Sequence, residues 1–127
     1  MQNGVVHRAN DLLDRTRRFA LATINFCEGL PKDETSKILG RQLLRSGTSV
    51  GANYRAAYRA KSKADFISKM GTVLEEVDES GYWIELLSAA GKVGVSTSGS
   101  LLQEANELVA IAISSINTAR RNSESGQ

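Results

Sequence analysis

The stretch from Arg41 to Lys63 constrains the fold of this chain more than any other segment. On a helix that turns by about 100° per residue, it places residues spaced alternately by four and three on one side, a pattern typical of a bundle helix. That inner face consists of Leu39, Leu43, Ser46, Val50, Asn53 and Ala57. The opposite face carries Arg41, Arg45, Arg55 and Arg59. The segment therefore predicts a helix that buries small side chains and exposes a basic face.

The middle of this helix is built from small residues that are poor helix formers. Gly47 and Gly51 each cost about 1 kcal/mol relative to alanine in a helix. Packing against neighbouring helices must offset this cost, and small side chains allow a close approach. A buried Asn53 needs hydrogen-bond partners, and Glu76 is the candidate partner. We therefore expect Ser46, Asn53 and Glu76 to form a buried polar set.

The rest of the chain repeats the helical pattern, and strand signals are nearly absent. Gly29 and Pro31 end the first helix, Asp33 can cap the second, and a Gly/Ser-rich linker precedes the last. We expect helices over residues 7–29, 34–60, 63–90 and 100–121, with Thr97 as an alternative start of the last one. Short connections then predict one all-α domain over residues 1–127, an antiparallel up-down-up-down four-helix bundle.

Two helices carry more apolar surface than one core stripe needs. Phe19 and Phe26 form a second stripe, which indicates either contact with another subunit or simply a wide buried face. The last helix is apolar nearly all round, which favours oligomerisation. The candidate interface residues are Phe19, Phe26, Tyr82, Trp83, Ile111 and Ile113.

Several function classes lack support in the sequence. His7 is the only histidine and Cys27 the only cysteine, so there is no metal-ligand set and no internal disulfide. Cys27 lies on an apolar seam, where a buried thiol is expected rather than a nucleophile. No apolar run approaches the roughly 20 residues of a membrane helix. We therefore expect a cytoplasmic protein that is not an enzyme and binds no cofactor, metal or membrane.

The net charge of +2 conceals an asymmetry. Residues 1–63 contain 12 Lys and Arg against 5 Asp and Glu, and residues 64–127 contain 4 against 9. The two halves can neutralise each other within the bundle or between subunits, or leave a basic patch free for a polyanion.

The basic face of the second helix is the strongest functional signal, because arginine forks suit phosphate oxygens. Tyr54 and Tyr58 lie at its margin and either stack on unpaired bases or pack in the bundle. No groove-reading motif is present, so binding to nucleic-acid backbone and shape is expected. The candidate nucleic-acid-binding residues are Arg41, Arg45, Arg55 and Arg59, followed by Lys61 and Lys63 and extended by Arg15 and Arg18.

Two motifs give the chain a family resemblance. They read Arg45-Ser-Gly-Thr-Ser-Val-Gly-Ala-Asn53, followed by Asp65-Phe66, and Glu75-Glu76-x-x-Glu79-x-x-Tyr82-Trp83. With them the chain resembles, over nearly its whole length, the 23S rRNA intervening-sequence proteins. The resemblance implies a four-helix bundle that assembles as a ring-shaped homopentamer. A related branch, the accessory variability determinant of diversity-generating retroelements, implies binding to nucleic acid and to a reverse transcriptase.

Two functional hypotheses follow. The first is a non-catalytic, homopentameric, nucleic-acid-binding accessory protein, with RNA favoured. The second is a protein-interaction scaffold, whose basic face serves oligomer assembly or docks a partner enzyme such as a reverse transcriptase.

Overall fold

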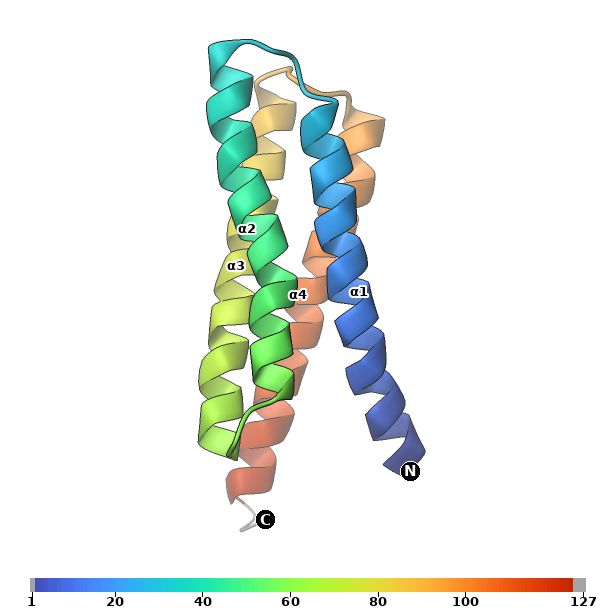
Figure 1. Ribbon diagram of the computed structural model, residues 1–127, viewed down its shortest axis with the longest axis vertical. Coiled ribbons are helices and arrows are strands. Elements are labelled where there is room, and N and C mark those ends of the chain that lie inside the picture. Colours follow the sequence, from blue (N-terminus) through green and yellow to red (C-terminus); the bar gives the residue numbers. More distant parts are fainter. Residues whose placement is uncertain (1, 125–127) are drawn as a thin grey trace.

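The computed structural model of the protein describes the backbone of residues 2–124 and the side chains of residues 11–122. Its helices are α1 (Gln2–Glu28), α2 (Glu34–Tyr58), α3 (Lys63–Ala89) and α4 (Val95–Glu124). Consecutive helices run in opposite directions and are joined by short connections at alternating ends (Figure 1). The predicted antiparallel four-helix bundle is therefore confirmed.

Most helix ends lie within two residues of their predicted positions, but two starts were placed too late. Helix α1 begins at Gln2 instead of residue 7, and α4 begins at Val95 instead of residue 100. The Gly/Ser-rich segment is therefore mostly helical, because Ser98 N donates to the carbonyl of Gly94 at 3.0 Å. Ser98 is also buried, and its hydroxyl lies 3.2 Å from that of Ser88. Gly91 alone adopts a positive φ, of 74°, among the described residues.

The core follows the predicted seams of all four helices. Burying a single large aliphatic side chain contributes about 1.5–3 kcal/mol. Fully buried aliphatic side chains line the centre of α2 and α3: Leu43, Val50, Val77, Ile84 and Leu87. Helices α1 and α4 cover this centre with Phe19, Leu101, Ala105, Leu108 and Ala112.

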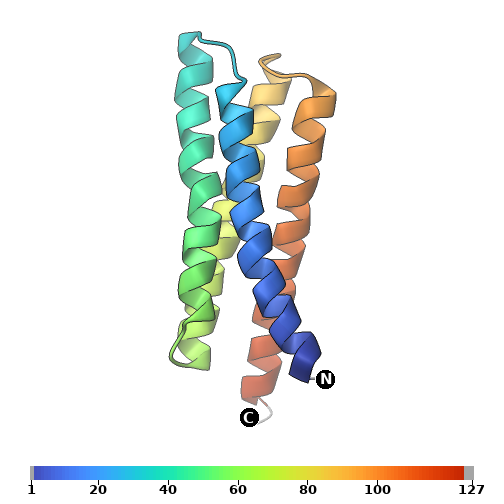
Figure 2. The same cartoon turned by 45° about the vertical axis from the view of Figure 1, so that its right-hand side comes forward.

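The four helices do not pack equally. Each consecutive pair is in extensive contact, whereas α1 and α4 touch far less. The N-terminal end of α1 also diverges from α2, as both views show (Figures 1 and 2). Two grooves flank α1, one lined by residues of α1 and α4 and the other by residues of α1 and α2.

Candidate nucleic-acid interface

The rotation of α2 is set by close contacts with α1 at two glycines. A Cβ atom at Gly47 would lie 2.7 Å from side-chain atoms of Thr23, which is fully buried. A Cβ atom at Gly51 would lie 3.3 Å from the backbone oxygen of Thr16. The two helices therefore touch along this small-residue stripe, which turns the arginine face of α2 toward solvent.

Arg41, Arg55 and Arg59 are exposed on this face. None of them forms an ion pair with any acidic side chain that the structure describes. At 1.5 Å per residue, Arg41 and Arg59 lie about 27 Å apart along the helix. Guanidinium groups without a balancing acid give this face a positive potential that attracts anions.

Arg45 interrupts the row, because acids of α3 neutralise it. Its Nη2 atom forms an ion pair with Glu79 Oε2, and Nη1 lies 3.6 Å from Glu76 Oε1. Trp83 Nε1 donates to the same Glu79 oxygen at 3.0 Å. Glu76 Oε1 is buried without a hydrogen bond to any described atom, so the nearby guanidinium compensates its charge. Arg45 therefore holds α2 against α3.

The predicted contact between Asn53 and Glu76 is wrong. Asn53 is half-buried, and its Nδ2 donates to the carbonyl of Ser49 on the same helix at 2.8 Å. The buried polar link between α2 and α3 is instead made by Ser46 and Ser80, whose hydroxyl oxygens lie 2.9 Å apart. Ser46 lies on the predicted inner face of its helix, but the sequence does not give the relative height of two helices, so its pairing with Ser80 was missed.

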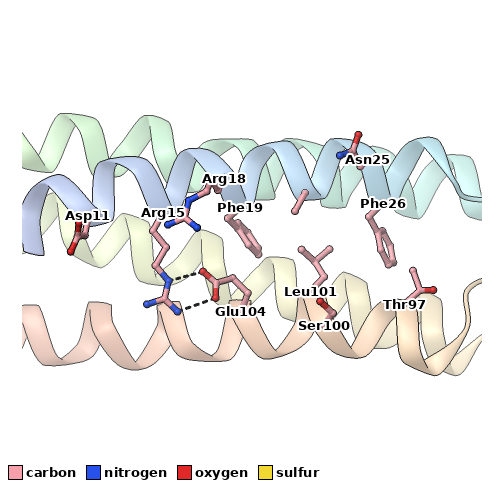
Figure 3. A pocket seen from close by; sticks show the side chains of 11 residues that line it. Asp11, Arg15, Arg18, Phe19, Asn25, Phe26, Thr97, Ser100, Leu101 and Glu104 are labelled. Atoms are coloured by element: carbon pink, nitrogen blue, oxygen red, sulfur yellow. Dashed lines mark hydrogen bonds and ion pairs between the residues drawn. The ribbon is translucent and has the colours of Figure 1, made fainter.

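Arg15 and Arg18 do not extend the basic face, contrary to the prediction. Arg15 points to α4, where Nε and Nη2 donate to Glu104 at 2.7 and 2.9 Å (Figure 3). Its Nη2 also donates to Glu107 at 2.6 Å. The hydrogen bonds to Glu104 raise the pKa of Arg15 above the ordinary arginine value, so this side chain stays charged. Arg18 pairs with Asp14 one turn away, with Nε 2.9 Å from the carboxylate.

The groove between α1 and α4 has a volume of about 960 Å³ and carries balanced charge. Arg15 and Glu104 span it, and Phe19, Phe26 and Leu101 form its apolar part (Figure 3). Phe19 is 1% and Phe26 9% exposed within a single chain. The second apolar stripe of α1 is therefore a wide buried face, which corrects the assignment of these two residues to a subunit interface.

The other candidate interface residues lie nearer the surface. Tyr82 is 56% and Ile113 44% exposed. Trp83 and Ile111 are half-buried and pack against the core. Tyr82 and Ile113 are thus the predicted contacts that remain available to a second subunit.

A second groove, between α1 and α2, brings together residues that the sequence had not grouped. Its volume is about 460 Å³, and Arg17 of α1 faces Arg55 and Arg59 of α2 across it. None of its lining residues within 11–122 is acidic, and Arg17 forms no ion pair with an acid of that part of the chain. Its other lining residues are Leu13, Ala20, Thr48, Gly51, Ala52 and Tyr58.

Arg17 was missed because Arg15, Arg17 and Arg18 look alike in sequence. Around the helix, Arg15 and Arg18 point only about 60° apart, whereas Arg17 points about 100° from Arg18 and about 160° from Arg15. Only the packing of α1 shows which neighbour each arginine meets. The spacing of acids does not separate Arg17 from Arg18, because Asp14 lies three residues before Arg17 and four before Arg18, and both are ion-pair spacings. The structure pairs Asp14 with Arg18.

The two tyrosines of α2 have different environments. Tyr54 is 4% exposed and belongs to the core, which confirms packing for this residue. Tyr58 is 45% exposed at the rim of the second groove. The ring centroids lie 6.5 Å apart with an interplanar angle of 45°, so the buried ring supports the exposed one.

The two lysines after α2 lie in the turn before α3 and at the first residue of α3. Lys61 is exposed, and its backbone N donates to Asp65 Oδ2 at 3.2 Å. Lys63 is the first residue of α3 and is half-buried. The side-chain hydrogen bond of Lys69 and the backbone hydrogen bond of Lys61 lower the pKa of Asp65. Lys61 therefore remains close to Arg59 at this end of the basic face.

The described residues offer no arrangement typical of a catalytic or metal site. No three His, Cys, Asp or Glu side chains among residues 11–122 are placed to hold a metal ion. Burial raises the pKa of the Cys27 thiol to about 11, which makes it a poor nucleophile at neutral pH. The side chain of His7 lies outside the described part. No described helix combines the length and hydropathy required to cross a membrane.

Comparisons with known proteins agree with this architecture. The sequence model of the family described as "23S rRNA-intervening sequence protein" matches residues 8–114, so the chain belongs to this family. It is similar to a crystal structure of a protein of unknown function from the S23 ribosomal protein family of Bacteroides thetaiotaomicron. The two share 35% identity and a TM-score of 0.80, over 86% of this chain and 97% of the other. No curated protein is significantly similar to the chain.

Proposed function

We propose that this protein is a non-catalytic nucleic-acid-binding protein that acts as a homopentamer, with RNA as the preferred partner. The observation that carries the proposal is that four exposed arginines of the first half of the chain have no described acidic partner: Arg17 on α1, Arg41 and Arg55 on α2, and Arg59 at the C-terminal end of α2. Phosphate contacts of this kind supply affinity without base specificity.

The charge distribution supports an external anion rather than an internal partner. The described arginines of α1 and α2 fall into two groups, because Arg15, Arg18 and Arg45 are neutralised within the subunit. Of the remaining four, Arg17, Arg55 and Arg59 line one groove, and Arg41 lies about 21 Å from Arg55 along α2. RNA is favoured over DNA because the description of the family names 23S rRNA.

The experiment replaces Arg41, Arg55 and Arg59 together by glutamine and measures binding to a fluorescent structured RNA at two salt concentrations. We expect the affinity to fall at least tenfold and the salt dependence to flatten, because about three phosphate contacts are lost. The control replaces Arg18, Arg120 and Arg121 by glutamine, which removes the same net charge elsewhere. Equal affinities of the two variants would contradict the proposal.

A protein-interaction scaffold is the second candidate, favoured by the exposed apolar side chains of Tyr82 and Ile113. In this case the arginine face would contact another subunit or a partner enzyme such as a reverse transcriptase. The triple glutamine variant would then change the mass of the assembly, measured by light scattering, and the wild-type protein would not bind RNA.

A further inference from the structure

The groove between α1 and α2 has the features of a specific ligand site. Arg55 and Arg59 lie one helical turn apart on α2 and therefore point to the same side. Arg17 lines the groove from α1, so both sides of the groove carry positively charged side chains. The volume of about 460 Å³ lies within the range of small-ligand pockets, about 300–1,000 Å³.

The concave shape follows from the sequence of α2. Gly51, Ala52 and Thr48 line the groove with little side-chain volume, and Ala20 does the same from α1. The hydroxyl of Thr48 donates to the carbonyl of Leu44 at 2.7 Å and is therefore satisfied within its helix. The charged donors among the described lining residues are the three guanidinium groups, which match the oxygens of a phosphate group.

We infer that this groove binds the phosphodiester backbone of an unpaired RNA strand, with one base stacked on the ring of Tyr58. Tyr58 lines the same groove as the three arginines, its ring is 45% exposed, and Tyr54 supports it from the core. Stacking on an aromatic side chain requires a base that is not paired. The inference rests on the proposed function and adds to it a preference for single-stranded segments.

The other groove beside α1 provides an internal comparison. It is larger, but Glu104 neutralises Arg15 there, and Asp11 adds a further negative charge. Because the charges in this groove balance, it does not attract a polyanion electrostatically. Arg17 and Arg18 are neighbours in sequence, yet Arg18 lines the charge-balanced groove and pairs with Asp14. This pair of residues offers a matched test.

The test measures fluorescence anisotropy of a labelled single-stranded RNA, and of the same strand in a duplex, with folded variants of equal melting temperature. We expect Arg17→Gln to weaken single-strand binding about tenfold, the loss of one charge-assisted hydrogen bond. Arg18→Gln removes the same charge and should change the affinity for the single strand by less than about twofold. Tyr58→Leu should also weaken single-strand binding about tenfold but leave duplex binding unchanged, whereas Tyr58→Phe should retain it.

The outcomes separate the groove from the proposed function. If the wild-type protein binds RNA but Arg17→Gln and Arg18→Gln weaken single-strand binding equally, the groove is not the site and the proposed function stands. If Tyr58→Leu has no effect, or weakens duplex binding as much, the preference for an unpaired strand is overturned. If the wild-type protein binds neither RNA, both the inference and the proposed function fail.

Discussion

The carboxylate of Asp33 links the connection between α1 and α2 to the connection between α3 and α4 at one end of the bundle. Asp33 caps α2, since its Oδ1 accepts from Ser36 N at 3.0 Å and its Oδ2 from Ser36 Oγ at 2.9 Å. Lys92, between α3 and α4, brings its ammonium group within 3.3 Å of Oδ1. These contacts, the Ser36 amide first, lower the pKa of Asp33 to about 2.

The depressed pKa gives Asp33 a defined influence on stability. Because the folded state favours the ionised carboxylate, its contribution is complete above about pH 4, the ordinary Asp pKa. It is lost as the pH falls toward 2. Asp33→Ala should therefore lower the melting temperature at pH 7, and the gap to the wild-type protein should narrow as the pH falls through about 2. Glu34→Ala, which removes the adjacent charge but no cap, should show a smaller gap. A gap for Asp33→Ala that persists unchanged to pH 2 would contradict this role.

At the scale of the element, α2 is a poor helix that is stabilised by its neighbours. Two of its hydroxyl groups donate hydrogen bonds to backbone carbonyls one turn earlier. The hydroxyl of Thr48 donates to the carbonyl of Leu44 at 2.7 Å, and that of Ser49 donates to the carbonyl of Arg45 at 2.6 Å. Ser46 and Ser80 add a buried hydrogen bond to α3. The sequence that weakens the isolated helix is therefore the one that allows close packing on two sides.

This view predicts opposite effects of alanine at two helical glycines. Gly47→Ala places a methyl group 2.7 Å from the buried Thr23 side chain, so overpacking of about 1–3 kcal/mol outweighs a propensity gain of about 1 kcal/mol. The free energy of unfolding in urea should fall by up to about 2 kcal/mol. A Cβ atom at Gly71 in α3 would have no atom within 4 Å, so Gly71→Ala should raise the free energy of unfolding by up to about 1 kcal/mol. Stabilisation by Gly47→Ala would contradict the close contact.

The elements were predictable from the sequence because the seams at 4-3 spacing and the caps are local signals. Ser46 was correctly placed in the core, and Arg41, Arg55 and Arg59 on the surface. The pairing of Arg45 with Glu79, of Arg15 with Glu104 and of Ser46 with Ser80 was not predictable. Each depends on the relative height and rotation of two packed helices, which the periodicity of one helix does not contain.

At the scale of the whole molecule, the apolar surface left on a single chain is the feature that bears on assembly. Ile113 is 44% exposed on α4, and Tyr82 is 56% exposed on α3. We expect native mass spectrometry to give five times the 13.7 kDa of one chain. Ile113→Glu should dissociate the assembly, because it places a charge in an apolar contact. Ser114→Glu, the exposed neighbour, should not. A monomeric wild-type protein would contradict the pentamer.

The central claim is that Arg17, Arg41, Arg55 and Arg59 bind RNA, and the salt dependence of affinity tests this claim most directly. For single strands the slope of log K against log salt concentration is about −0.7 per phosphate contact. Four contacts predict a slope of about −3 for one subunit, and a steeper slope if several subunits engage one RNA. Salt-sensitive binding of this size near physiological salt would support the account. An affinity that does not change with salt, or no binding at all, would contradict it.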